Sequence, residues 1–172
     1  MITLAALLPF WDKLSDEQQQ AIAQGTLQRT VKKGQLVHNG DGDCAGLIGV
    51  ACGRLRAYAL SEEGREITLY RLLERDICLF SASCMLRGGD FNLYVEAETD
   101  SVLLILAAKV YARLLAESTY VAAFTNEIMA QRFSDVMWLL DQTLYKRFDA
   151  RLAAFLLEEG AYGQQEGRLT HE

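Results

Sequence analysis

The order of apolar and polar positions divides the chain into a helical start, a strand-rich middle and a helical end. Between residues 31 and 107, turn signals recur every few residues, and the runs between them alternate apolar with polar side chains. The clearest runs are LRAYAL (55–60), with Leu55, Ala57 and Ala59 on its apolar side, and REITLYRL (65–72), with Ile67 and Leu69 on its apolar side. Many short strands at near-even spacing predict a double-sheet jelly roll or antiparallel barrel.

Helical patterns flank this strand-rich part. A first helix is predicted to start after Ser15, which forms a capping-box pattern with Gln18, and to end at Gly25. After residue 107 the apolar spacing becomes helical again. It predicts a short helix over about 107–118, a long helix over about 120–148 and a further helix over 151–160.

The long helix carries large apolar residues at every third or fourth position, which form one broad face of a rod roughly 40 Å long. These residues are Val121, Phe124, Ile128, Met129, Phe133, Val136, Leu140, Leu144 and Phe148. A barrel can cover only the first part of such a rod. Burying about eight of these side chains releases on the order of 10–20 kcal/mol, whereas association costs about 4–15 kcal/mol. A homodimer is therefore predicted, with its interface at Phe124, Ile128, Met129, Phe133, Val136, Leu140 and Leu144.

Composition and charge restrict the function further. The 172 residues suit one domain with a sizeable core, and no apolar run is long enough to span a bilayer. No signal peptide is evident, and the four cysteines lack a regular framework, so a cytoplasmic protein with reduced thiols is expected. The net charge of −6 and the lack of a Lys/Arg cluster make this chain alone a poor nucleic-acid binder.

Helix, jelly roll, short helix and long dimer helix together resemble the CRP/FNR family of bacterial transcription regulators. The residues that carry the resemblance are Gly34, Gly40–Asp41, GRLRAY from Gly53, EEGREITL from Glu62, Asp76, AETDSVLLIL (97–106) and RFSDVMWLLDQTLYKRFDARLAAFLL (132–157). The family implies a mainly β fold with α-helices, in which a cyclic-nucleotide-binding-like jelly-roll barrel is followed by a dimerisation helix.

The resemblance also implies a domain organisation. Residues 1–118 would form the sensor barrel with its flanking helices, and residues 119–148 the dimerisation helix. Residues 149–172 would form a hinge helix and the start of a truncated winged helix-turn-helix domain, which opens at LTHE (169–172). DNA binding is then expected from the missing carboxyl-terminal domain of the full-length regulator. An effector bound near residues 77–92 would shift the long helices and so the DNA-binding heads.

In the cyclic-nucleotide-binding members, a Gly-Glu pair contacts the ribose, an Arg-Ser or Arg-Thr pair holds the phosphate, and a polar pair on the dimer helix meets the base. The resemblance places these pairs at Leu79 and Phe80, at Phe91 and Asn92, and at Val136 and Met137. None of them keeps the chemistry that a buried anion requires. A degenerate effector pocket is therefore expected, and it would favour an apolar or aromatic ligand over cyclic AMP. The residues of this pocket are Cys78, Leu79, Phe80, Ser81, Phe91, Asn92, Val136 and Met137.

The cysteines leave alternatives open. Neither Cys44 and Cys52 nor Cys78 and Cys84 have the CxxC spacing of zinc or redox sites, and burial as core filler is the favoured reading. A redox switch through Cys78 and Cys84 would require an exposed thiol with a lowered pKa. A haem sensor would use His38 and Cys44 as ligands. A dimerisation scaffold without an effector is the third alternative, and no cofactor is otherwise assigned.

An enzyme is not expected. A catalytic metal site in a jelly roll usually assembles several histidines, whereas this chain has His38 and His171, the latter close to its end. Ser81 and Ser83 have no histidine nearby in the sequence that would act as their base. No metal site is predicted.

Overall fold

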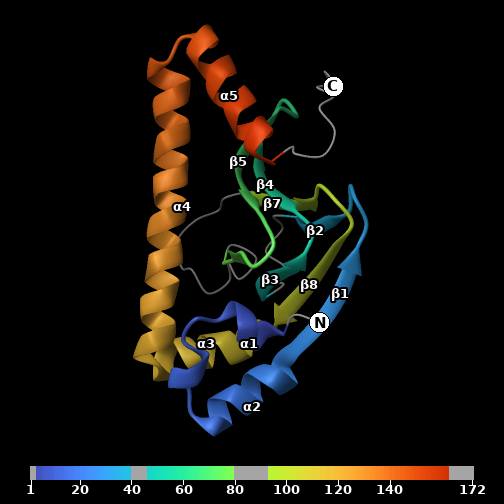
Figure 1. Ribbon diagram of the computed structural model, residues 1–172, viewed down its shortest axis with the longest axis vertical. Helices are drawn as coiled ribbons and strands as arrows, with labels where there is room; N and C mark the ends of the chain where they lie inside the picture. The colour runs from blue at the N-terminus through green and yellow to red at the C-terminus, as the bar shows by residue number, and fades with distance from the viewer. Residues whose placement is uncertain (1–2, 40–45, 80–92, 163–172) are drawn as a thin grey trace. The chain divides into compact units, whose positions relative to one another are not determined.

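The computed structural model describes residues 3–39, 46–79 and 93–162 (Figure 1). The chain divides into two compact units, Met1–Phe133 and Ser134–Glu172, and each is described on its own. The long helix α4 (Thr119–Tyr145) begins in the first unit and ends in the second. The domain boundaries at 118 and 148 stay predictions.

The first unit contains two antiparallel sheets of four strands each, counted over the described residues. One sheet has the order β1-β8-β3-β6 and the other the order β2-β7-β4-β5. The strands are β1 (Thr26–Val31), β2 (Leu36–Asn39), β3 (Leu47–Cys52), β4 (Leu55–Leu60), β5 (Glu66–Leu72), β6 (Ile77–Cys78), β7 (Leu93–Ala97) and β8 (Ser101–Leu106). The predicted double-sheet jelly roll with flanking helices is confirmed.

Helices lie before and after the strands in the chain. They are α1 (Leu4–Leu7), the 3-10 helix η1 (Trp11–Lys13), α2 (Asp16–Gly25), α3 (Ala108–Glu117), α4 (Thr119–Tyr145) and α5 (Phe148–Tyr162). The predicted capping box is present, since Ser15 Oγ accepts from the Gln18 backbone N–H and the Gln18 side chain accepts from the Ser15 N–H. Figure 1 shows α1, α2 and α3 gathered at one end of the barrel.

The break between the last two helices comes earlier than predicted. The long helix was expected to include Phe148, but α4 ends at Tyr145 and Phe148 begins α5. Charges near the break favour it, because Lys146 and Arg147 follow the carboxyl end of α4 and Asp149 lies in the first turn of α5. Each charge thus lies where the helix dipole stabilises it.

Two expectations about the strands were wrong. The strand-rich part begins at β1, directly after α2, and not at residue 31. In β5, Ile67 is 53% exposed whereas Tyr70 and Leu72 are buried, which is the reverse of the predicted apolar side. A register shift accounts for the burial of Tyr70 and Leu72, because Ala57 pairs with Tyr70 and Tyr58 with Thr68. The extra residue Leu69 moves Tyr70 and Leu72 to the side that faces the core, whereas Ile67 lies near the exposed start of the strand.

The two sheets differ in how they are covered. β3 and β8 of the first sheet are buried on both faces, which matches their continuous apolar sequences LIGVAC and SVLLIL. β7 of the second sheet alternates buried with half-buried residues. The inner face of the first sheet joins a core between the sheets, and its outer face joins a second core with the helices.

Gly49 marks the place where the amino-terminal segment approaches the first sheet. A Cβ built on Gly49 would lie 2.6 Å from Leu7 Cδ1 and 3.3 Å from Leu4 Cδ1. A glycine at this position therefore lets α1 pack directly on β3.

The second unit contains the end of α4 and α5. Many of its large apolar side chains are exposed: Met137, Trp138, Leu140, Leu144, Tyr145, Phe148, Leu152, Phe155, Leu156 and Leu157. No helix in the described ranges has the length and apolar character that crossing a bilayer requires.

Candidate functional site

The first half of α4 is anchored in the first unit. Its buried residues are Val121, Thr125, Ile128 and Arg132, which recur at intervals of four, three and four and so lie on one face. Thr125 Oγ1 donates to the Val121 carbonyl oxygen at 2.7 Å and lies 2.7 Å from the Tyr111 hydroxyl of α3. Because the single Thr125 proton is used on Val121, the Tyr111 hydroxyl is the donor to Thr125.

Arg132 is a charged side chain on this buried face. It is 9% exposed, and its guanidinium carbon lies 4.5 Å from the centre of the Tyr70 ring of β5. The stacking fixes the plane of the guanidinium against the barrel. Our sequence reasoning missed Arg132, although the signal is present: it follows Phe124 and Ile128 by eight and four positions, within the apolar stripe.

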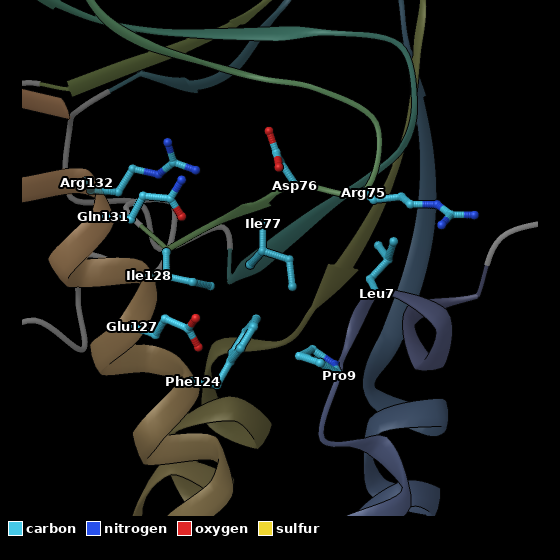
Figure 2. A pocket seen from close by; sticks show the side chains of 10 residues that line it. All are labelled: Leu7, Pro9, Arg75, Asp76, Ile77, Phe124, Glu127, Ile128, Gln131 and Arg132. Carbon is cyan, nitrogen blue, oxygen red and sulfur yellow. The ribbon is translucent and has the colours of Figure 1, made fainter. Parts of the chain in front are cut away.

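A cleft of about 350 Å³ lies beside Arg132 in the first unit (Figure 2). Its apolar lining residues are Leu7, Pro9, Ile77, Phe124 and Ile128. Its polar and charged lining residues are Arg75, Asp76, Glu127, Gln131 and Arg132. Figure 2 shows α4 on one side, the segment of Leu7 and Pro9 on the other, and residues 75–77 across one end. Its volume lies near the lower end of the range for small-molecule sites, about 300–1,000 Å³.

The turn at Arg75 and Asp76 is held rigidly at this cleft. Arg75 has a φ of 77°, an uncommon value for a residue other than glycine, and its N–H donates to the Val50 carbonyl oxygen at 2.8 Å. The Asp76 carboxylate accepts from the Leu73 N–H at 2.8 Å, and the Asp76 carbonyl oxygen accepts from the Val50 N–H at 3.0 Å. Asp76 therefore closes the turn, and the Arg75 side chain extends away from the other labelled residues.

The structure describes half of the residues of the predicted effector pocket. Cys78 and Leu79 are both buried, but Cys78 belongs to the core between the sheets and Leu79 to the core under the helices. Val136 is half-buried and Met137 is 47% exposed, and both belong to the second unit. Phe80, Ser81, Phe91 and Asn92 lie outside the described residues. That pocket stays a prediction.

The predicted dimer residues fall into two groups. Ile128 is buried, and Phe124 and Met129 pack against the same core under the helices. Phe133, Leu140 and Leu144 are 68%, 44% and 67% exposed, and Val136 is half-buried. Together with Met137, the three exposed residues form a strip with spacings of four, three and four, which we call the α4 strip (Phe133, Met137, Leu140 and Leu144).

The residues of the redox and haem alternatives are placed only in part. Cys78 is buried in β6 and His38 in β2, whereas Cys44 and Cys84 lie outside the described residues. Over the residues that the structure places, no three His, Cys, Asp or Glu side chains gather where they would hold a metal ion. Neither alternative is tested by these positions.

The comparison with known proteins comes from solved structures, since neither a protein-family model nor a curated protein sequence matches the chain. A protein from Eubacterium rectale ATCC 33656, described as a transcriptional regulator of the CRP/FNR family, is 49% identical with a TM-score of 0.87. The match covers 91% of this chain and 72% of that one. The chain belongs to the CRP/FNR family. This confirms the resemblance inferred from the sequence.

Two solved structures of lower sequence identity share the fold. FixK2 from Bradyrhizobium japonicum is 19% identical with a TM-score of 0.68, over 83% of this chain and 69% of that one. The sensor domain of the regulator DNR from Pseudomonas aeruginosa is 21% identical with a TM-score of 0.62, over 84% of this chain and 93% of that one. At these identities the likeness shows the fold alone.

Proposed function

We propose that the chain is the effector-sensing and dimerisation module of a CRP/FNR transcription regulator. The observation that carries the proposal is the division of α4 into a half that is buried beside the cleft and a half that exposes the α4 strip. One helix thus joins a ligand-sized cleft to a surface suited to a second copy of the chain.

The α4 strip supports the dimer. Its four apolar residues follow the alternating spacing of four and three that two-stranded coiled coils use. In the single chain they are 44% to 68% exposed, so a second copy would remove much of their surface from water. The proposed interface is therefore shifted along the helix from the predicted one, because Ile128 is already buried in its own chain.

The cleft supports effector sensing. A ligand there would touch Phe124, Ile128 and Arg132, which all belong to α4. Binding shifts an equilibrium only when the ligand prefers one of two arrangements. A ligand that fits one position of α4 better than another would therefore bias the dimer, and through it the DNA-binding part of the regulator.

The same proposal assigns the remaining roles. Cyclic AMP is not the proposed effector, because Leu79, at the position expected to contact its ribose, is buried among apolar residues. DNA contact is assigned to a part of the regulator that is not among these 172 residues, whose net charge of −6 suits DNA poorly. The module is proposed to act in the cytoplasm by binding, without a catalytic step.

Sedimentation equilibrium of the 172-residue chain tests the dimer. We expect twice the chain mass for the unchanged protein. Replacing both Leu140 and Leu144 by Glu should weaken association at least about 100-fold, because two charges would enter an apolar seam. The folded content, measured by circular dichroism, should stay the same, since both side chains are exposed in the single chain.

Gln142→Glu is the matched control. It adds a charge to the same turns of α4, but a 3.6-residue period places it roughly opposite Leu140. We expect dimerisation within about threefold of the unchanged protein. A monomer before any substitution, or equal loss in the control and the double variant, would reject the α4 strip as the dimer interface.

A further inference from the structure

Over the described residues, the two sheets end in four edge strands, which differ in how well they are protected against pairing with a further strand. β1 and β6 lie at the edges of the first sheet, and β2 and β5 at the edges of the second. β6 has two residues, and β2 and β5 each contain a register shift against the neighbouring strand. Short edge strands and bulges are common means of preventing such pairing. β1 has neither, since its six residues pair with β8 without a register shift.

The outer edge of β1 is accessible. Thr26 is half-buried, residues 27–30 are exposed and Val31 is buried. In an antiparallel pair, every second residue directs its N–H and C=O groups to the neighbouring strand, and the residues between direct theirs outward. Within the described ranges only β8 pairs with β1, so the outward groups of β1 have no strand beside them. Figure 1 shows β1 at the border of the strand-rich part, next to β8.

Two unpaired cations accompany this edge. Arg29 is exposed and lies on the same face of the strand as Leu27, which is 57% exposed. Lys33 is exposed just beyond the end of the strand. Lys32 Nζ lies 2.7 Å from Asp100 Oδ2, whereas in the described part of the chain no carboxylate pairs with Arg29 or with the Lys33 side chain. An edge that offers backbone groups, an apolar side chain and two unpaired cations suits an extended peptide with acidic side chains.

We infer that the outer edge of β1 binds an extended acidic segment of another protein, which adds to the first sheet as a further strand. Main-chain hydrogen bonds to β1 hold the segment, and its acidic side chains lie against Arg29 and Lys33. The net charge of −6 does not prevent this, because charges farther away than about 8 Å are largely screened at physiological ionic strength. The inference goes beyond the proposed function, since no residue of β1 lines the cleft or belongs to the α4 strip.

Titration of the 172-residue chain by heteronuclear NMR, with three peptides of equal length, tests the inference. The acidic probe is acetyl-Glu-Val-Glu-Val-Glu-Thr-amide, and the cationic probe has Lys in place of each Glu. The blocked probe keeps the acidic sequence but is N-methylated at its two central residues, which prevents strand pairing on either of its edges. We expect the acidic probe to bind with a dissociation constant on the order of 1 mM or below, at least about 10-fold more tightly than the other two.

Hydrogen exchange identifies the edge that binds the peptide. With the acidic probe at saturation, the outward amides of β1 should exchange at least about 10-fold more slowly, because each new hydrogen bond protects its donor. The amides of the edge strands β2 and β5 should keep their exchange rates.

Two arginine variants separate the charge at the edge from the charge of the whole chain. Arg29→Glu should weaken binding of the acidic probe at least about fivefold and strengthen binding of the cationic probe. Arg151→Glu is the matched control, because it changes the net charge equally but lies on α5. It should change the affinity for the acidic probe by less than about twofold. Both positions are exposed, so circular dichroism should show an unchanged folded content.

Several results would overturn the inference. Equal binding of the acidic and blocked probes would show that charge alone holds the peptide, without strand addition. A preference for the cationic probe, an equal loss in the Arg29 and Arg151 variants, or no binding at several millimolar peptide would also reject it. Protection of the β1 amides that rises with protein concentration in the absence of peptide would make a second copy the occupant of this edge, in place of an acidic segment.

Discussion

The two halves of α4 have similar apolar sequences but opposite surroundings. Before Phe133, large side chains such as Val121 and Ile128 are buried in the core under the helices. From Phe133 onward, Leu140 and Leu144 remain 44% and 67% exposed, and no residue of this half is buried. The helix is continuous across the change, so backbone structure does not cause it.

This difference shows that helical periodicity identifies a face that will be buried but not what buries it. The barrel and the helices around it cover the first half of α4. The second half needs another partner, and the proposed partner is a second copy. Substitutions in the first half of α4 should therefore lower the stability of the single chain, whereas substitutions in the second half should weaken dimerisation.

The largest expected effect distinguishes folding from association. Ile128→Ala removes a buried side chain and should lower the free energy of unfolding by about 2–4 kcal/mol at every protein concentration. Leu140→Ala should lower it only at concentrations where the dimer forms, because its contact is with the second copy. Urea unfolding across a wide concentration range measures both. Equal, concentration-independent losses would show that both halves are buried by their own chain.

A smaller effect compares two threonines. Thr125 and Thr143 both donate to the carbonyl oxygen four residues earlier, at 2.7 and 2.8 Å, but Thr125 is buried and Thr143 is exposed. Thr125→Val should cost about 1–3 kcal/mol, because it removes the acceptor of the buried Tyr111 hydroxyl. Thr143→Val should change the free energy of unfolding by less than about 0.5 kcal/mol. If urea unfolding gives similar losses of stability for Thr125→Val and Thr143→Val, the two halves of α4 do not differ in burial as described.

The smallest effect concerns Tyr111 itself. Burial raises the pKa of Tyr111 above its ordinary 10.0. Below pH 10.0 both folded and unfolded chains keep the phenol proton; above it, the unfolded chain loses the proton first, so stability falls as pH rises. Tyr111→Phe should cost about 1 kcal/mol at neutral pH and show a shallower alkaline loss.

Tyr120→Phe is the control for this pH dependence, since Tyr120 is 51% exposed and lies in the first half of α4, which also carries Thr125, the partner of Tyr111. Its thermal unfolding should match the unchanged protein at neutral and alkaline pH. If the Tyr111 and Tyr120 variants have the same pH profile, burial of Tyr111 does not contribute to the alkaline loss.

Local patterns in the sequence were sufficient for most elements. The capping box of Ser15 and Gln18 gave the start of α2, and alternation gave β4 and β5. The burial of Tyr70 and Leu72 in β5 was not predicted, because a single extra residue at Leu69 shifts the alternation. A bulge depends on the pairing with β4, and a strand read alone does not contain that information.

The candidate site was less accessible from the sequence. Counting along the resemblance gave a pocket that includes Leu79, Val136 and Met137, and this pocket stays a prediction. The cleft joins three segments that lie far apart in the sequence, around Leu7, Ile77 and Ile128. Arg132 could have been identified from the sequence as a charged residue within an apolar stripe. Its stacking on Tyr70, however, depends on contact between α4 and β5.

The sequence by itself determined the jelly roll with its flanking helices and the family, because turns, alternation and helical spacing are local patterns that can be read from the linear sequence. Tertiary structure decided which half of α4 is buried by its own chain, where Arg132 lies and which segments line the cleft. These features depend on contacts between residues far apart in the chain, and the burial that such contacts produce is what gives a charge or an apolar face its role.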